Sequence, residues 1–584
     1  MLRRCPLLIA LALTLPTVAL AQSDPGLRDA VEAYDTDRDA LRSFYDGPPS
    51  PAQRERMATF LGQQADSLPE LADDATLAAA IDRHLLETEI GYQQALLDRA
   101  AAREASLVDL LPFADDVLAL VTDAGNATYA YDGDPRGAAD VLAKIKAAAE
   151  SLRPGDGETP PSATDAKRAA ERAGALRRAL EYWFEQREPF DPVFAWWVAA
   201  PYAEATAALD DYVAHLYGDV AGLTMSGDDS NDPLVGDPIG REALLEDLEH
   251  EMIPYTPEQL VAIALRELEW CREQQIAAAQ EMGLGDDWRA ATEQMKGQTV
   301  GPGEQDEQVR RLAEESIAFL DERDLVTIPD LCRETWRLRM VAPRNQRIWP
   351  FGAYGGQHML VSYAASEMDH ARKIESMRGN AIPLTRTVVQ HELIPGHHLQ
   401  RFVAERSRPY RSAFSTPFYV EGWALYWEML LWDLEFPRTP EERLGMLLWR
   451  SHRSARIVVS LGFHLGQMTP PEMIDYLVDE IGLERDGATA EVRRYIGDSY
   501  SPLYQCAYLI GGLQLRSLSN ELVNGGDEPM TYKQFHDAVL AEHSIPFAMV
   551  RAALLDLPAD ELAEPWAWEG EVEPAASPAT KPAQ

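Results

Sequence analysis

The sequence is poor in basic residues for its acidic content. Of its 584 residues, 53 are lysine or arginine and 95 are aspartate or glutamate, so the formal net charge is −42. Nucleic acids and anionic lipid surfaces are bound through clustered Lys and Arg, so this balance argues against both kinds of partner. The composition is not that of a disordered chain, because 46% of the residues are hydrophobic and 13 are tryptophan. We expect the acids to form a well-solvated surface that disfavours strongly acidic peptides.

Cysteine is also scarce, with four residues in the chain. Three of them, Cys271, Cys332 and Cys506, follow the first 21 residues, and none forms a Cys-x-x-Cys motif. An odd number of cysteines in a chain of this length argues against a disulfide framework. We predict that all three are small buried residues.

Long apolar runs are absent beyond the amino terminus, so no membrane span is predicted. The terminus has the pattern of a secretory signal, because two arginines precede an apolar stretch at 7–15 and Ala-Leu-Ala at 19–21 forms a cleavage site. Residues 1–21 are therefore predicted to be a signal peptide. The mature protein is expected to be exported, either periplasmic or secreted.

Apolar residues three or four apart recur through most of the chain, which predicts a mainly α fold. A loop rich in Gly, Asp and Pro at 225–238 predicts a boundary between one helical region at 22–235 and a second at 236–568. The tail at 569–584 is rich in Glu, Pro and Ala, and we predict that it is disordered. The best strand candidate is 358–363. Helices are predicted at 27–46, 51–67, 74–104, 136–153, 164–187, 239–282, 303–322, 383–406, 417–434, 440–466 and 502–523.

The strongest chemical signal is the segment His-Glu-Leu-Ile-Pro-Gly-His-His at 391–398. It begins like a His-Glu-x-x-His zinc helix, but Pro395 stands where the second histidine belongs. In a regular helix His397 would lie about 9 Å along the axis from His391, too far to share an ion. Proline followed by glycine can loop residues out of the helix and bring His397 back. We therefore predict His391 and His397 as metal ligands, with Glu392 beside them. The alternative is a kinked helix without a metal.

A third ligand is predicted on the next helix, at Glu421. It lies 24 residues after His397, in an aromatic segment where a buried acid needs a cation. Glu428 lies on the same helical face and could orient a ligand from behind. His398 would be too far along an unbroken helix to bind the same ion, so we expect a supporting or structural role for it. The alternative for Glu421 is an acid favoured by the helix dipole.

These two motifs resemble the bacterial family called domain of unknown function 885. The resemblance covers nearly the whole mature chain, and it is carried by motifs at 391–400, 421–428, 449–464, 491–495, 508–516 and 535–537. The family is similar to gluzincin metallopeptidases, which implies a zinc ion held by His391, His397 and Glu421, with Glu392 as general base. It also implies a large helical body with a deep active-site channel, short peptide substrates and a short edge strand that pairs with substrate, for which 358–363 is the candidate.

Two further residues are candidates for stabilising the oxyanion during hydrolysis, Tyr508 and His464. Their alternatives are a core tyrosine and a histidine that caps a helix. Arg516 could hold a peptide carboxylate, but a structural ion pair is the alternative. Two other functions compete with a peptidase: a zinc-dependent amide or ester hydrolase acting on a non-peptide substrate, and a non-catalytic exported zinc-binding protein. The sequence leaves the oligomeric state and the position of cleavage in the peptide open.

Overall fold

The computed structural model describes residues 25–45, 47–72, 74–121, 133–152, 160–225, 232–346, 351–497, 500–525, 528–570 and 572. Over these residues the fold is mainly α, with 22 α-helices and one small three-stranded sheet, as the sequence predicts. The predicted signal peptide at 1–21 and most of the predicted tail at 569–584 lie outside them. Within them, no helix is both long and apolar enough to cross a bilayer.

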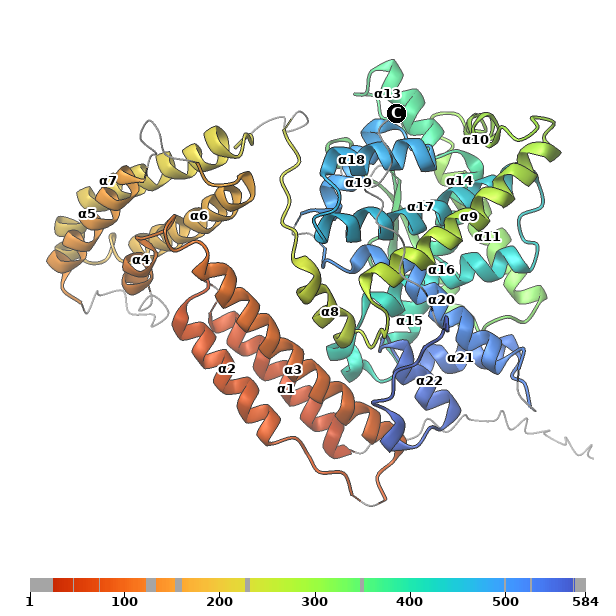
Figure 1. Ribbon diagram of the computed structural model, residues 1–584, viewed down its shortest axis with the longest axis horizontal. Helices are drawn as coiled ribbons and strands as arrows, with labels where there is room; N and C mark the ends of the chain where they lie inside the picture. The colour runs from red at the N-terminus through yellow and green to blue at the C-terminus, as the bar shows by residue number, and fades with distance from the viewer. Residues whose placement is uncertain are drawn as a thin grey trace, which may run out of the picture.

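The chain begins with a three-helix arm that leads away from the main body of the molecule (Figure 1). Its helices are α1 (Pro25–Phe44), α2 (Pro51–Asp66) and α3 (Leu77–Ala105). The α2 and α3 helices begin at side-chain caps, since Ser50 and Thr76 each accept a hydrogen bond from a backbone N–H in the first turn. Apolar residues of all three helices join one hydrophobic core with residues of the body.

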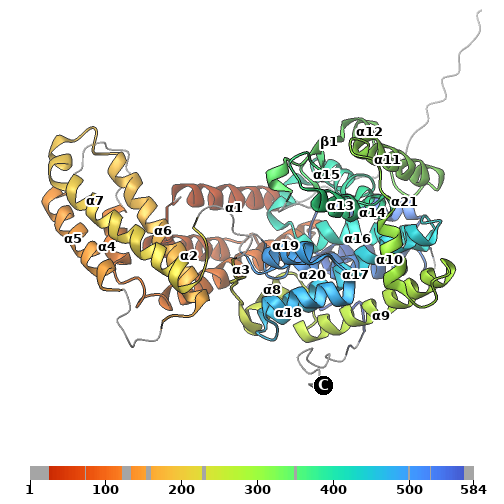
Figure 2. The ribbon, with the colours of Figure 1, turned by 90° about the horizontal axis from the view of Figure 1, so that it is seen from above.

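A second lobe lies at the far end of this arm (Figure 2). It contains α4 (Ala114–Val121), α5 (Pro135–Ser151), α6 (Ala163–Glu185), α7 (Pro192–Ala214) and the short π-helix η2 (His215–Val220). Its buried residues form a hydrophobic core of their own, drawn from 107–221. The predicted domain boundary at 235/236 follows this lobe and stays a prediction.

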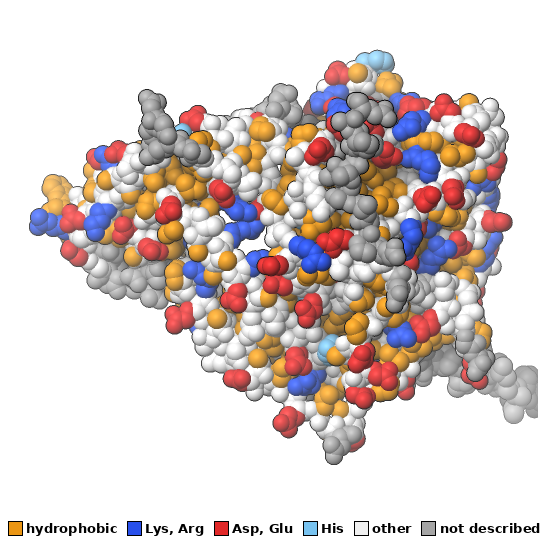
Figure 3. All heavy atoms as spheres, viewed as in Figure 1, with side chains coloured by type: hydrophobic (Ala, Val, Ile, Leu, Met, Phe, Trp, Pro, Cys, Tyr) orange, Lys and Arg blue, Asp and Glu red, His pale blue; other side chains and the backbone are white. Residues whose placement is uncertain are grey.

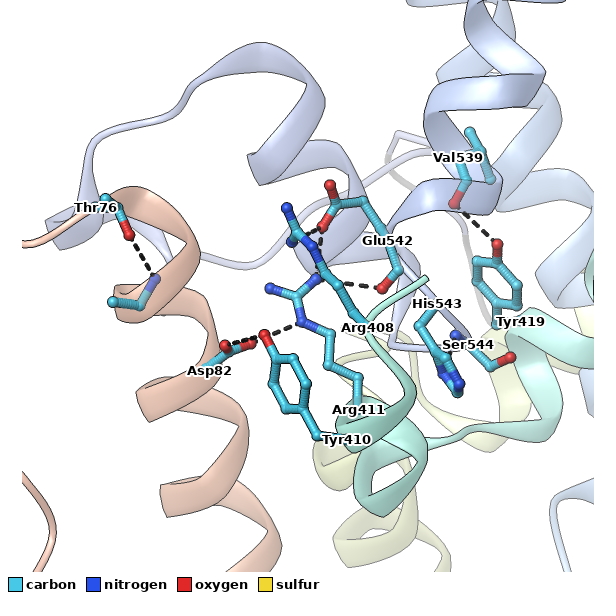
Figure 4. Close-up of polar contacts among 11 residues, drawn as sticks. Thr76, Asp82, Arg408, Tyr410, Arg411, Tyr419, Val539, Glu542, His543 and Ser544 are labelled. Atoms are coloured by element: carbon cyan, nitrogen blue, oxygen red, sulfur yellow. Dashed lines mark hydrogen bonds and ion pairs between the residues drawn. The ribbon is translucent and has the colours of Figure 1, made fainter. Parts of the chain in front are cut away.

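The arm is attached to the body by buried ion pairs as well as by apolar contacts (Figure 4). Asp82 of α3 accepts hydrogen bonds from Arg411 Nε and from the Tyr410 hydroxyl, both at 2.7 Å. Arg411 reaches on to Glu542 at 2.5 Å, and Arg408 pairs with the same carboxylate at 2.6 Å. Asp82 and Arg411 have no exposed surface, so neither charge is compensated by water.

The body of the molecule contains the remaining helices. They are α8 (Gly240–His250), α9 (Pro257–Glu281), α10 (Trp288–Lys296), α11 (Gln305–Glu322), α12 (Asp330–Thr335), α13 (His370–Gly379), α14 (Ile382–Glu392), α15 (His397–Ala404), α16 (Pro417–Asp433), α17 (Pro440–His464), α18 (Pro470–Tyr476), α19 (Arg485–Tyr495), α20 (Tyr504–Leu522), α21 (Tyr532–Ala541) and α22 (Phe547–Leu555). Shorter turns of helix are η3 (Pro343–Asn345), η4 (Pro409–Phe414), η5 (Leu477–Ile481) and η6 (Ala559–Glu561).

Two glycines let the central helices α16 and α20 touch. A Cβ atom on Gly511 would overlap the carbonyl oxygen of Phe418, and one on Gly422 would overlap the backbone of Gly511. Glycine at both positions therefore permits a close helix contact. It fixes the α16 helix, which carries Glu421, against the start of α20, which carries Tyr504 and Tyr508.

The sheet has the strand order β1-β3-β2. The β1 strand (Arg337–Met340) pairs in parallel with β3 (His358–Val361), and β2 (Gly352–Tyr354) pairs with β3 in the antiparallel direction. The predicted strand is present, but as the middle strand, so both of its edges are already paired. The predicted role of 358–363 as the edge that pairs with substrate is therefore wrong, and β2 is the edge strand on that side.

The helix predictions differ from the structure in two ways: some predicted helices are interrupted, and some observed helices were not predicted. The segments 239–282 and 383–406 are each two helices, because a chain reversal at 251–256 and a break at 393–396 interrupt them. Among the residues that the structure describes, nine helices lie outside the predicted ranges: α4, α7, α10, α12, α13, α18, α19, α21 and α22. In the longest of them, α7, Trp196, Trp197 and Pro201 obscure the helical pattern. Cys271, Cys332 and Cys506 are buried and free, as predicted.

Charged side chains of both signs are interspersed over the face shown in Figure 3. Acidic residues lie among lysines and arginines there rather than in a single acidic patch. On this face the acidic excess has the form of a dispersed, solvated surface.

Candidate metal centre

The α14 helix ends at Glu392 because the next residues cannot continue it. Leu393 has ψ −108°, and Pro395, which follows a cis peptide bond, has no N–H to donate. Gly396 turns back so closely that a Cβ atom would overlap the carbonyl oxygen of His391. A new helix, α15, then begins at His397. This is the interruption that the Pro-Gly pair predicts, and it changes the direction in which His397 points.

The interrupted segment is held in place by two buried hydrogen bonds. Ser316 Oγ donates to the carbonyl oxygen of Ile394 at 2.9 Å, and Trp423 Nε1 donates to that of Pro395 at 2.9 Å. The backbone groups that leave the helical pattern are therefore satisfied inside the protein. The break is a fixed part of the fold, supported by α11 and α16.

Three side chains meet at the break. His391 Nε2 and His397 Nε2 lie 3.3 and 3.4 Å from the same oxygen of Glu421, and the two imidazole rings are almost perpendicular. One ligand atom from each of the three residues lies within 4.8 Å of the others, so the group could hold a metal ion. All three residues are buried, with 3% to 8% of their surface exposed. The predicted ligand set is thus brought together, and His398 is not part of it.

A second carboxylate supports the first histidine from behind. His391 Nδ1 donates to Glu428 Oε1 at 2.8 Å, which leaves Nε2 directed at the other two ligands. Burial lowers the pKa of His391, but the hydrogen bonds to Glu421 and Glu428 outweigh burial and raise it to about 9. The sequence suggested this orienting position for Glu428, and the contact is the one that metal-binding histidines usually make.

Glu421 is held by a residue that the sequence reasoning missed. The hydroxyl of Tyr504, at the start of α20, donates to the Glu421 oxygen that does not face the histidines. Burial favours the neutral form of Glu421, yet the two histidines reverse this effect and lower its pKa well below the usual value. The acid is therefore ionised in a buried place. A buried cluster of carboxylates and imidazoles is stabilised by a cation, which makes a bound metal ion chemically reasonable here.

His391, His397 and Glu421 line a pocket of about 940 Å³. Glu392, the residue after His391, also lines the pocket, and β2 contributes Gly352, Ala353 and Tyr354 to the lining. The edge strand β2 thus forms part of the pocket lining. Tyr508 also lines it, with its ring 6.1 Å from that of His391 and tilted by 21°. Burial raises the pKa of the Tyr508 phenol, so the hydroxyl keeps its proton and is available as a donor.

Three other predicted residues lie elsewhere. His464 does not line this pocket: it is buried at the end of α17, two helical turns beyond Arg456, and burial lowers its pKa to about 4. His398 is engaged by the carbonyl oxygen of Cys332 at 3.0 Å and by the Tyr354 hydroxyl, which is the structural alternative. Arg516 pairs with Asp433 at 2.9 Å on the surface, away from the pocket.

Fold and site together define a mainly α protein with a buried His-His-Glu group that could hold a metal ion. The chain belongs to the family of bacterial proteins of unknown function DUF885, whose model matches residues 42–554. No match is found among curated proteins.

Two solved structures share the fold. One is a protein of unknown function from Shewanella oneidensis, provisionally described as a lipoprotein, with 17% identity, a TM-score of 0.65, and coverage of 91% of this chain and 99% of the other. The second, from Colwellia psychrerythraea and also provisionally described as a lipoprotein, has 15% identity, a TM-score of 0.59, and coverage of 92% and 99%. At these identities the likeness extends to the fold alone.

Proposed function

We propose that this protein is an exported zinc metallopeptidase that hydrolyses short peptides. The observation that carries the proposal is the buried group of His391, His397 and Glu421, which shares a pocket with the carboxylate of Glu392. Two imidazoles and one carboxylate are the ligands of many catalytic zinc sites, which keep a further position open for water. A bound zinc ion would supply a Lewis acid that polarises this water and the scissile carbonyl.

The chain's own residues have distinct parts in this reaction. Glu392 removes a proton from the attacking water and passes it to the leaving amine. The Tyr508 hydroxyl donates to the carbonyl oxygen as negative charge develops on it. Glu428 fixes the tautomer and the orientation of His391, and Tyr504 holds the carboxylate of Glu421 in its orientation.

The free edge of β2 favours peptides over other amides and esters. An edge strand offers unpaired N–H and C=O groups in extended register, and a peptide main chain can pair with them. Non-peptide amides and esters lack that repeating pattern. Export is supported by the predicted signal peptide and by the two structural relatives described as lipoproteins.

Mass spectrometry of a mixed peptide digest tests the proposal. We expect the purified protein to generate new peptide termini. Treatment with a zinc chelator should stop this hydrolysis, and returning zinc should restore it. Intact peptides alongside consumed esters or acyl-amides would contradict the peptidase assignment, and a protein purified without any bound metal would contradict the metal site.

A matched pair of histidine variants locates the metal. His397→Ala should lose the ion, whereas His370→Ala, which removes an exposed histidine of α13, should retain it. Metal loss in both variants, or in neither, would place the ion elsewhere.

A further inference from the structure

The wall of the pocket next to Tyr508 contains an excess of buried positive charge. Arg453 and Arg456 of α17 and Arg494 of α19 all line the pocket. Arg453 and Arg456 are only 5% and 8% exposed. This local charge is opposite in sign to the net charge of the chain, and a buried guanidinium without a counter-charge is unfavourable.

The carboxylate of Glu491 faces two of these arginines, Arg456 and Arg494, and it is fully engaged. Glu491 accepts a hydrogen bond from Arg456 Nη2 at 3.0 Å, another from Arg494, and a third from the Tyr495 hydroxyl at 2.5 Å. Burial raises the pKa of Glu491, but the neighbouring arginines outweigh burial and lower it far below its usual value, so the residue is ionised. Glu491 therefore bonds to both Arg456 and Arg494, and its single negative charge offsets only one of these two positive charges.

The guanidinium of Arg453 has few polar contacts. Its Nε and Nη1 atoms are buried without a hydrogen-bond partner among the residues that the structure describes. The nearest acid is Glu428, 3.6 Å from Nη2 and already bound to His391 at 2.8 Å. The guanidinium packs against the rings of Trp449 and Tyr508, with its central carbon 4.9 and 5.5 Å from their centres. Arg453 therefore has one long ion pair and two buried N–H groups without an acceptor among the described residues. Such a planar, preorganised group is suited to binding a carboxylate through two parallel hydrogen bonds.

We propose that Arg453, supported by Arg456 and Arg494, binds the C-terminal carboxylate of the peptide substrate. This assignment rests on the proposed peptidase function and narrows it to cleavage near the carboxyl end of short peptides. The Tyr508 ring lies 6.1 Å from the His391 ring and 4.6 Å from the Arg456 guanidinium, so those two groups are at most about 11 Å apart, the length of roughly three extended residues. A carboxylate bound there leaves room for one to three residues after the scissile bond.

Paired probes test the assignment by binding, without relying on turnover. The probes are trialanine with a free carboxyl terminus, trialanine amide, and an amidated tripeptide that ends in aspartate. Isothermal titration on the Glu392→Gln variant should show the free acid binding roughly 10- to 100-fold more tightly than the amide, as expected for a hydrogen-bonded charged group. Equal binding of acid and amide would overturn the proposal. Tight binding of the aspartate peptide alone would overturn the C-terminal assignment in favour of an acidic side chain.

Arginine variants test whether the preference for the free carboxyl terminus depends on Arg453 and its neighbours. In Arg453→Gln the ratio of the binding affinities for the free acid and the amide should fall close to one. Arg453→Lys should keep part of the preference for the free acid because the positive charge remains. Arg494→Gln, whose side chain is 20% exposed, should reduce the ratio partially and serves if Arg453→Gln does not fold. Arg516→Gln is the matched control, because it removes a surface arginine that pairs with Asp433 and should leave the ratio unchanged. A preference that persists in both Arg453→Gln and Arg494→Gln would overturn the proposal.

The same probes separate this proposal from the peptidase function. If peptides are never hydrolysed but the preference for the free acid still depends on Arg453, the carboxylate site stands and the catalytic proposal fails. If peptides are hydrolysed equally well as acids and as amides, the catalytic proposal stands and the carboxylate site fails.

Discussion

Tyr508 lies between the metal ligands and the arginines, with its ring beside His391 on one side and Arg456 on the other. If its hydroxyl stabilises the developing oxyanion, Tyr508→Phe should lower kcat by about 10²-fold, as loss of one such donor does in other hydrolases. KM and metal content should change little, since the ring itself remains. Steady-state kinetics on one peptide measures this. An unchanged kcat would assign Tyr508 a packing role instead.

In the proposed metal site Glu428 would act only through His391, to which it is bonded at 2.8 Å. Glu428→Gln keeps the shape of the side chain but removes its charge, so we expect metal affinity to fall by about 10- to 100-fold. Competition with a coloured chelator measures the affinity directly. Glu405→Gln is the control, because Glu405 lines the pocket but pairs with Arg401 at its exposed edge. Equal affinities in both variants would mean that Glu428 does not orient the ligand.

At the scale of elements, the contact between α16 and α20 determines how Glu421 meets Tyr504. Gly511→Ala would force the two helices apart, because the new methyl group has no room against Phe418. Overpacking of this kind costs about 1–3 kcal/mol of stability, and here it should also weaken metal binding. Gly91→Ala in α3 is the matched control, since nothing lies within 4 Å of the added atom, and it should be neutral or slightly stabilising. Denaturant unfolding of both variants measures the difference, and equal stabilities would contradict the role of this contact.

The sequence predicted the parts of the site that are encoded locally. His391, Glu392 and His397 lie within seven residues, and the Pro-Gly pair between them implies the break that the structure contains. The parts of the site that depend on contacts between distant segments could not be predicted from the sequence. Which strand lies at the edge is decided by how three short segments pair, and the periodicity of 358–363 carries no information on that choice.

Long-range contacts also explain why the sequence did not predict the roles of Tyr504 and Arg453. Tyr504 meets Glu421 across 83 residues of sequence, and only the packing of α16 on α20 brings them together. Arg453 has the sequence context of an ordinary basic residue on a helix. The lack of hydrogen-bond partners for its Nε and Nη1 atoms is a property of the assembled pocket, because Glu491 bonds to Arg456 and Arg494 instead.

At the scale of the whole molecule, the arm is joined to the body through the buried pair of Asp82 and Arg411. Asp82→Asn would leave a buried guanidinium with only Glu542 for compensation, and breaking such a pair costs about 3–5 kcal/mol. We expect a lower unfolding midpoint in denaturant and, under native conditions, faster proteolysis within α1–α3 than within α16 or α17. A variant as stable as the wild type would show that the apolar contacts alone attach the arm.

The stability of the molecule should also depend on pH through buried neutral histidines. Burial lowers the pKa of His536 to about 3 and that of His464 to about 4. Because both values lie below the ordinary value of about 6.5, the unfolded chain takes up protons first, so this stabilisation is complete above about pH 6.5 and is lost as pH falls toward 4. Each group contributes a slope of up to about 1.4 kcal/mol per pH unit in that range.

Thermal unfolding of the wild type at pH 7.5 and pH 5 measures this effect, and the lower midpoint should occur at pH 5. The difference should be smaller in His464→Leu, which removes one of the titrating groups from the core. A midpoint that rises on acidification would contradict this interpretation of the histidines.

The central claim is that a metal ion held by His391, His397 and Glu421 works together with Glu392 as the general base. Zinc content and peptide turnover, measured on the same preparations of wild type and Glu392→Gln, test it most directly. We predict one zinc ion per chain in both proteins and a loss of turnover of about 10²- to 10⁴-fold in the variant. A variant that hydrolyses peptides at the wild-type rate, or a wild type without bound metal, would contradict the account.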